Sequence, residues 1–177
     1  MAARSRLLAS LAATLVVLVA PSAGSADVRT MSSSNQLQTA LLGQVNTLRA
    51  ANGLGRLRLS TSLSAAAGRH STEMARRGYF SHDSANGQSF STRIAHAYSP
   101  RGYRSWSVGE NLVWGGPDIG AARAFQLWLS SPPHRANLLN ARWREVGLGA
   151  VHSSSAPGVY GGGPATIVTA DFGARSR

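Results

Sequence analysis

The order of the periodic segments is the feature that most restricts what this chain can fold into. The segments with apolar residues at helical spacing come first in the chain, and alternation takes over near the C-terminus. One alternating segment, WSVGENLVWGG (106–116), lies between the helical segments. A parallel sheet would need regular β-α-β alternation, which this order lacks. The sequence therefore predicts an α+β fold in which helices cover an antiparallel sheet.

The predicted helices are amphipathic. The first starts at a capping box formed by Ser33 and Gln36 and ends at Asn52-Gly53. The second runs from residues 60–62 to Gly78. Its apolar face comprises Leu63, Ala66, Ala67, His70 and Met74. A short helix, STRIAHA, is capped by Ser91, and another starts at Pro117-Asp118 and is stopped by Pro132-Pro133.

Two strands are predicted in the last third. The segments EVGLGAVH (145–152) and TIVTADFG (166–173) alternate in polarity, and the glycine-rich loop SSSAPGVYGGGP joins them. This pattern predicts an antiparallel hairpin, with Thr169 and Asp171 on the opposite face from Ala170 and Phe172.

The N-terminus has the pattern of a secretory signal peptide. Arg4 and Arg6 precede an apolar run at 7–20, and Gly24 and Ala26 supply small residues for cleavage. A membrane anchor is the alternative, but the run is shorter than the roughly 20 residues of a spanning helix. We therefore expect a signal peptide at 1–26 cleaved near Ala26, a flexible leader at 27–34, one domain at 35–174, and a secreted product without a membrane span.

Composition narrows the chemistry. The chain has no cysteine, so it has neither disulfides nor a thiol nucleophile. All 18 basic residues are arginine, and the net charge of +11 favours nonspecific attraction to polyanions. A lysine-free, alanine-rich composition is also typical of a GC-rich bacterial genome. No nucleic-acid module is recognisable, so no specific nucleic-acid partner is expected.

Four segments in a fixed order resemble the CAP superfamily of cysteine-rich secretory, antigen 5 and pathogenesis-related proteins. They are VNTLRAANGLGRLRLSTSL, RHSTEMARRGYFSHDS, GENLVWG and LWLSSPPHRANLLNARWREVGLGAV. The likeness extends from about residue 37 to 172 and is greatest to the bacterial, cysteine-free branch. It implies a three-layer α-β-α sandwich with a cleft lined by His82, Glu110 and His134. The family's fourth position, usually an acid, falls near Ser131 here.

Several activities are compatible with those cleft residues. Two imidazoles and a carboxylate (His82, Glu110, His134) could bind zinc or another divalent cation with a position open to water, although their spacing carries no ligand signature. A Ser131-His134-Glu110 hydrolase is a weaker alternative, because no nucleophile elbow is present and Ser131 is most simply a cap or turn residue.

A non-catalytic binding module is the preferred interpretation. It needs no cofactor and is expected to be a monomer that binds a cell-wall polymer, a lipid or a small apolar ligand. Aromatic residues close to the motifs are candidates for the rim of the cleft, namely Tyr79, Tyr103, Trp106 and Trp114. A purely structural role for the cleft residues stays open. Structural roles are also expected for Asn46, Arg49, His70, Arg93 and Asn111.

Overall fold

The computed structural model describes residues 24–177. The helices are α1 (Gly24–Ala51), α2 (Thr61–Arg77), α3 (Phe90–Ala95), α4 (Ala121–Ser130) and α5 (Pro132–Leu138), with a 3-10 turn at Gly158–Tyr160. The strands are β1 (Arg58–Leu59), β2 (Ser105–Gly115), β3 (Glu145–Ser153) and β4 (Ala165–Ser176). Residues 1–23 of the predicted signal peptide lie outside the described residues.

The four strands form one sheet in the order β1-β3-β4-β2. Strand β4 pairs antiparallel with both β3 and β2, while the two-residue β1 pairs parallel with β3. The predicted hairpin is therefore present, with Leu148 opposite Ala170. The sheet is mainly antiparallel, which confirms the predicted α+β class, and β2 is an edge strand.

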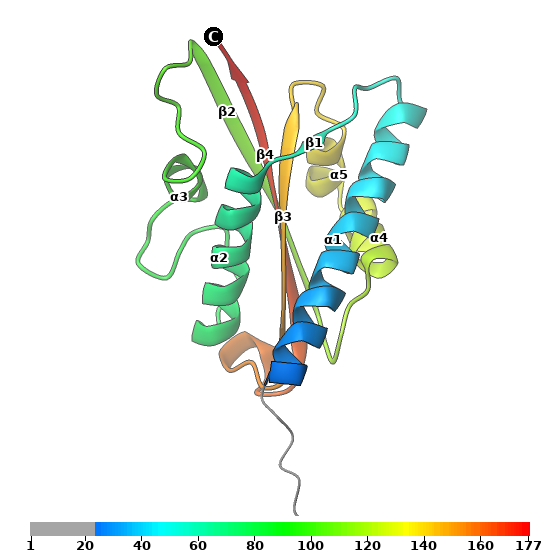
Figure 1. The fold of residues 1–177 in the computed structure, drawn as a ribbon, viewed down its shortest axis with the longest axis vertical. Helices are drawn as coiled ribbons and strands as arrows, with labels where there is room; N and C mark the ends of the chain where they lie inside the picture. The colour runs from blue at the N-terminus through cyan, green and yellow to red at the C-terminus, as the bar shows by residue number, and fades with distance from the viewer. Residues whose placement is uncertain (1–23) are drawn as a thin grey trace, which may run out of the picture.

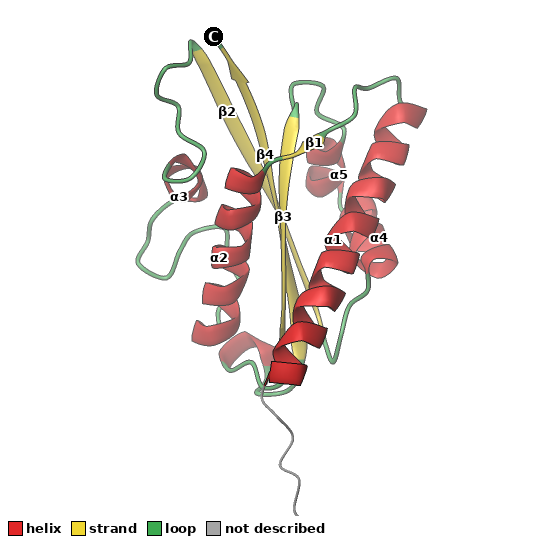
Figure 2. Cartoon of the chain, viewed as in Figure 1, coloured by secondary structure: helices red, strands yellow, loops and turns green. Residues whose placement is uncertain are grey.

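The sheet lies between two layers of helices, as Figure 1 and Figure 2 show. Helices α1, α4 and α5 cover one face, where Leu41, Trp128 and Leu138 pack with apolar side chains of the strands. Alternate strand residues such as Leu148 and Phe172 point into this core. The three-layer α-β-α arrangement is confirmed.

Helix α2 lies on the other face and touches β3 directly. The close approach depends on Gly147 and Gly149. A Cβ atom added at Gly147 would lie 2.0 Å from the Leu63 carbonyl carbon, and one added at Gly149 would lie 2.3 Å from the Gly68 nitrogen. Because α2 packs so closely, this face of the sheet is also buried. Polar residues on it, including Thr169 and Asp171, are fully enclosed.

Three predicted helix starts differ from the structure. Helix α4 begins at Ala121, after the N-cap Gly120, and not at Pro117-Asp118. Helix α1 begins at Gly24, so Ser33 lies within the helix and the predicted leader at 27–34 is helical. Helix α3 is capped by Ser89, whose hydroxyl accepts from the Thr92 backbone N–H, and not by Ser91. For α3, two serines near the helix start, Ser89 and Ser91, compete for the cap. The bounds of the signal peptide and of the domain stay predictions.

Candidate functional site

A cleft lies where the loop before α3, the edge strand β2 and helix α5 meet. It encloses about 510 Å³. The structure brings together the three residues that the resemblance implied, His82, Glu110 and His134, as lining residues of this cleft. The other lining residues are Phe90, Gly109, Asn111, Pro133, Ala136, Asn137 and Asn140.

Both oxygens of the Glu110 carboxylate have partners. The Nδ1–H of His82 donates to Oε1 at 2.8 Å, and the Arg93 guanidinium pairs with Oε2. The Glu110 side chain is fully buried, whereas the His82 side chain is half exposed. Arg93 also donates to the His82 carbonyl at 2.8 Å, so one cation holds both the carboxylate and the loop that carries the imidazole.

His70, on α2, binds the same loop through a backbone carbonyl. Its ring is fully buried, and Nε2–H donates to the Ser81 carbonyl at 2.9 Å. Burial, followed by the charge of Arg93, lowers the pKa of His70, so the ring is neutral at neutral pH. His70 and Arg93 thus bind two consecutive carbonyls, those of residues 81 and 82, and fix the position of His82.

His134 lies on the first turn of α5, which begins at Pro132. The Asn111 amide donates to the His134 carbonyl at 3.1 Å, and Asn137 donates to the Asn111 amide oxygen at 2.9 Å. Asn137 also donates to the Glu110 carbonyl at 3.1 Å, which protects the edge of β2. Burial, with a contribution from His82, lowers the pKa of His134, so its ring is neutral at neutral pH.

Asn46 and Arg49 connect α1 to the rest of the domain. Asn46 makes a reciprocal pair with the Leu57 backbone, accepting from its N–H at 2.7 Å and donating to its carbonyl at 3.1 Å. Arg49 is completely buried and donates to the carbonyls of Gly55, Leu138 and Asn140. The last two carbonyls lie at and just after the end of α5, so Arg49 fixes the helix end next to the cleft.

Asp171 is a buried carboxyl group that the sequence did not single out. It lies on β4 directly opposite Glu110 on β2, and both its oxygens are without a hydrogen-bond partner among the described residues. Burial, followed by the negative charge of Glu110, raises the pKa of Asp171 well above the ordinary value of 3.8. Two carboxyl groups therefore share a buried site with one guanidinium, that of Arg93.

Replacing Asp171 by asparagine is expected to remove a pH-dependent penalty. With a raised pKa, the folded protein binds more protons than the unfolded chain above pH 3.8, so the wild type loses stability as the pH rises from there to the folded-state pKa. The stability of Asp171→Asn relative to wild type should consequently increase with pH over this window. Urea unfolding at pH 4, 5, 6 and 7 measures it; a relative stability that falls with pH would show that Arg93 holds Asp171 ionised.

Ser131 and the predicted aromatic rim lie elsewhere. Ser131 separates α4 from α5, makes no side-chain cap, and is not among the residues that line the cleft. Trp114 packs edge-on against Tyr160 at 5.0 Å between ring centroids, and Trp106 donates to the Tyr98 carbonyl. None of the four rim candidates lines the cleft, so this prediction is wrong; the lining aromatic residue is Phe90.

The charges around Glu110 do not suit a zinc ion in the cleft. The charged guanidinium of Arg93 already neutralises Glu110, and its positive charge opposes a cation at the same carboxylate. Between residues 24 and 177, no group of three or more His, Cys, Asp or Glu side chains is placed to hold a metal ion. The side chains as arranged do not fit a three-ligand zinc centre.

The fold is that of a three-layer SCP-type domain with its cleft at an edge strand. The family model described as the cysteine-rich secretory protein family matches residues 42–172, and the chain belongs to this family. Its lack of cysteine is consistent with the cysteine-free bacterial branch. No match was found among curated proteins.

Solved bacterial structures share the fold. An extracellular SCP-domain protein from Bacillus anthracis is 25% identical with a TM-score of 0.66, covering 85% of this chain and 43% of that one. An outer surface protein from Borrelia burgdorferi is 22% identical with a TM-score of 0.60, and the match covers 80% of this chain and 94% of that one. A cysteine-rich secretory protein from Staphylococcus aureus is 18% identical with a TM-score of 0.57, and the match covers 81% of this chain and 40% of that one. The chain thus spans less than half of the first and third proteins.

None of the helices between residues 24 and 177 combines the length and apolarity of a membrane span.

Proposed function

We propose that this protein is a secreted, non-catalytic binding module of the bacterial cell envelope, whose ligand enters the cleft between His82 and His134. The predicted signal peptide supports export. The Bacillus anthracis and Borrelia burgdorferi proteins, described as extracellular and as an outer surface protein, support a location outside the cell.

The observation that carries the proposal is the paired state of Glu110. A catalytic histidine needs a nucleophile on one side and an orienting acid on the other. Here Glu110 orients the His82 ring and is itself paired with Arg93, but no hydrogen bond joins a hydroxyl group to the ring of His82 or His134 in the described part of the chain. An oriented imidazole without a nucleophile beside it supports binding over hydrolysis.

The chemistry of the lining indicates an uncharged saccharide. Phe90, Pro133 and Ala136 supply apolar surface. Among the described residues, the His134 ring and the His82 Nε2 atom have no hydrogen-bond partner and can bind hydroxyl groups. Because Glu110 is neutralised and the His134 ring is neutral, the cleft presents little net charge. A stretch of peptidoglycan glycan combines the apolar faces and hydroxyl groups that such a lining recognises.

Binding to purified peptidoglycan sacculi stripped of anionic polymers tests the proposal. The variant His134→Ala is expected to weaken retention about fivefold or more, since it removes a hydrogen-bonding and stacking group from the lining. His96→Ala is the matched control, because His96 is exposed and lies outside the cleft. Equal retention of wild type and His134→Ala, with both folded by circular dichroism, would contradict this function.

A further inference from the structure

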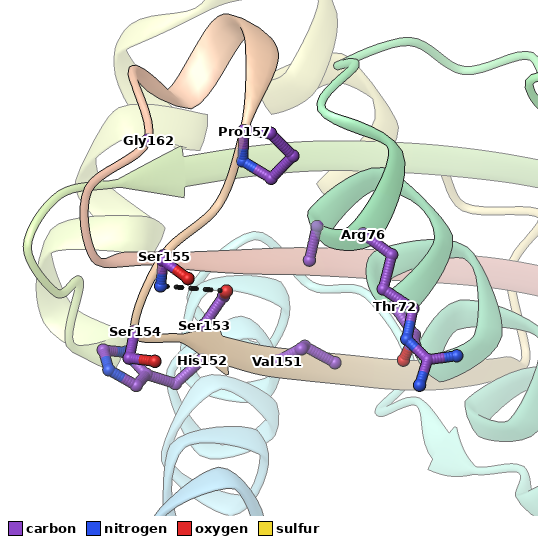
Figure 3. Close-up of a pocket in the computed structure, with 10 residues that line it drawn as sticks. Thr72, Arg76, Val151, His152, Ser153, Ser154, Ser155, Pro157 and Gly162 are labelled. Atoms are coloured by element: carbon purple, nitrogen blue, oxygen red, sulfur yellow. Dashed lines mark hydrogen bonds between the residues drawn. The ribbon is translucent and has the colours of Figure 1, made fainter.

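A second hollow lies at the end of the sheet where α2 stops. It encloses about 740 Å³, more than the cleft, and shares no lining residue with it. Figure 3 shows Thr72 and Arg76 of α2 on one side of the hollow and His152, Ser153, Ser154 and Ser155 on the other. Val151 of β3 lies between the two groups in this view.

The loop that closes the hollow is firmly anchored to the domain. The Val159 N–H donates to the Gly78 carbonyl at 3.0 Å, and the Tyr160 hydroxyl donates to the Tyr79 carbonyl at 2.8 Å. The Ala156 N–H donates to the Gly163 carbonyl at 2.9 Å, which closes the loop on itself. The wall formed by Pro157 and Gly162 is therefore preformed.

The lining has positive charge and hydroxyl groups but no acid. Its ten residues include Arg76, His152, three serines and a threonine, and none is Asp or Glu. No carboxylate in the described part of the chain pairs with Arg76. The next residue, Arg77, has its Nε atom 3.6 Å from Glu73 Oε1. The Arg76 guanidinium is therefore available to pair with an anionic ligand, whereas Arg77 is already paired with Glu73.

A hydrogen-bond chain fixes the orientation of His152. The Thr166 hydroxyl donates to Asp118 Oδ1 at 2.5 Å, so the Thr166 oxygen is free to accept at 3.0 Å from Nδ1–H of His152. Thr166 is buried, with 3% of its surface exposed. The imidazole of this exposed residue is thus held by a buried partner on the opposite face of β3 from Val151, where His152, Thr166 and Asp118 line a separate hollow.

We propose that this hollow is a second binding site, which takes a phosphorylated sugar or polyol. The phosphate is bound by the Arg76 guanidinium, whose planar N–H groups match phosphate oxygens. The hydroxyl groups of the ligand are bound by Ser153, Ser154 and Ser155. The volume of about 740 Å³ exceeds the needs of a single inorganic anion and suits such a ligand.

Titration of the ¹⁵N-labelled protein with glycerol 3-phosphate tests the site. Saturable shifts are expected in the amide signals of residues 151–155. Arg76→Gln should weaken binding about tenfold, the loss of one charge-assisted contact. Arg77→Gln changes the net charge equally on the same helical turn and should have less than about a twofold effect, because Glu73 already pairs with Arg77.

Three results would overturn the proposal. Equal weakening in the two arginine variants would show that the ligand responds only to the overall charge of the protein. Binding of glycerol as tight as that of glycerol 3-phosphate would exclude recognition of phosphate, and inorganic phosphate binding as tightly would exclude recognition of the polyol. This proposal is independent of the cleft, because His134→Ala should leave the titration unchanged.

Discussion

Replacing Arg93 with methionine is expected to lower the free energy of unfolding by about 3–5 kcal/mol at neutral pH, the usual cost of removing one partner of a buried ion pair. Arg93 is the guanidinium that pairs with the buried Glu110 carboxylate, and the uncharged variant would leave that carboxylate against Asp171. The same substitution removes the donor to the His82 carbonyl. The cleft loop should loosen as the domain is destabilised.

Urea unfolding measures this effect when the wild type is compared with Arg93→Met, with the double variant Arg93→Met/Glu110→Gln and with Arg101→Met. Adding Glu110→Gln to Arg93→Met should recover part of the loss, because the carboxylate that Arg93 neutralises is then absent. Arg101→Met is the control, since Arg101 is exposed, and should change stability by less than about 0.5 kcal/mol. A loss no larger for Arg93→Met than for Arg101→Met would contradict the buried ion pair.

Replacing Gly147 with alanine is expected to destabilise the domain by about 3 kcal/mol or more. The added Cβ atom would lie 2.0 Å from the Leu63 carbonyl carbon and 2.1 Å from the Ser64 nitrogen. Both are backbone atoms of α2, so the whole helix would have to move away from β3.

Gly43→Ala is the matched control for this substitution. Gly43 lies within α1, and nothing comes within 4 Å of a Cβ atom built there. Alanine at that position should raise stability by about 0.5–1 kcal/mol through helix propensity. Thermal unfolding followed by circular dichroism compares the two variants. A melting temperature for Gly147→Ala within a degree or two of wild type would contradict the direct contact between α2 and β3.

Much of the fold could be predicted because the chain carries clear periodicity. The apolar face of α2 and the hairpin of β3 and β4 match their predicted spacings. The burial of Asp171 could not be predicted in this way. Alternation places Asp171 opposite Ala170 but does not say whether that second face meets solvent or a helix. The signal was the glycine pair at 147 and 149, which marks a close helix approach.

The candidate site was only partly predictable. The motifs placed His82, Glu110 and His134 in one cleft, but not the contacts that decide what these residues can do. Arg93 lies 17 positions from Glu110 and His70 lies 11 from Ser81, and no local pattern predicts these pairs. Asn137 could have been found, since it lies three residues after His134 on one helical face.

The buried contacts support the proposed binding role of the cleft. His70 and Arg93 hold two consecutive carbonyls of the loop before α3, and Asn111 holds the carbonyl of His134 on α5. A ligand that binds between these two anchored backbone segments need not order them, and the His82 ring is also held by Glu110, so less conformational entropy is lost on binding.

We propose that the protein binds peptidoglycan without cleaving it. The most direct test incubates stripped sacculi with wild-type protein and with His134→Ala, then measures both the bound protein and the soluble sugar and peptide fragments released. Binding that depends on His134, with fragment release no greater than in buffer, is the expected result. Fragment release by the wild type that the variant loses would contradict the claim and make the cleft an active site.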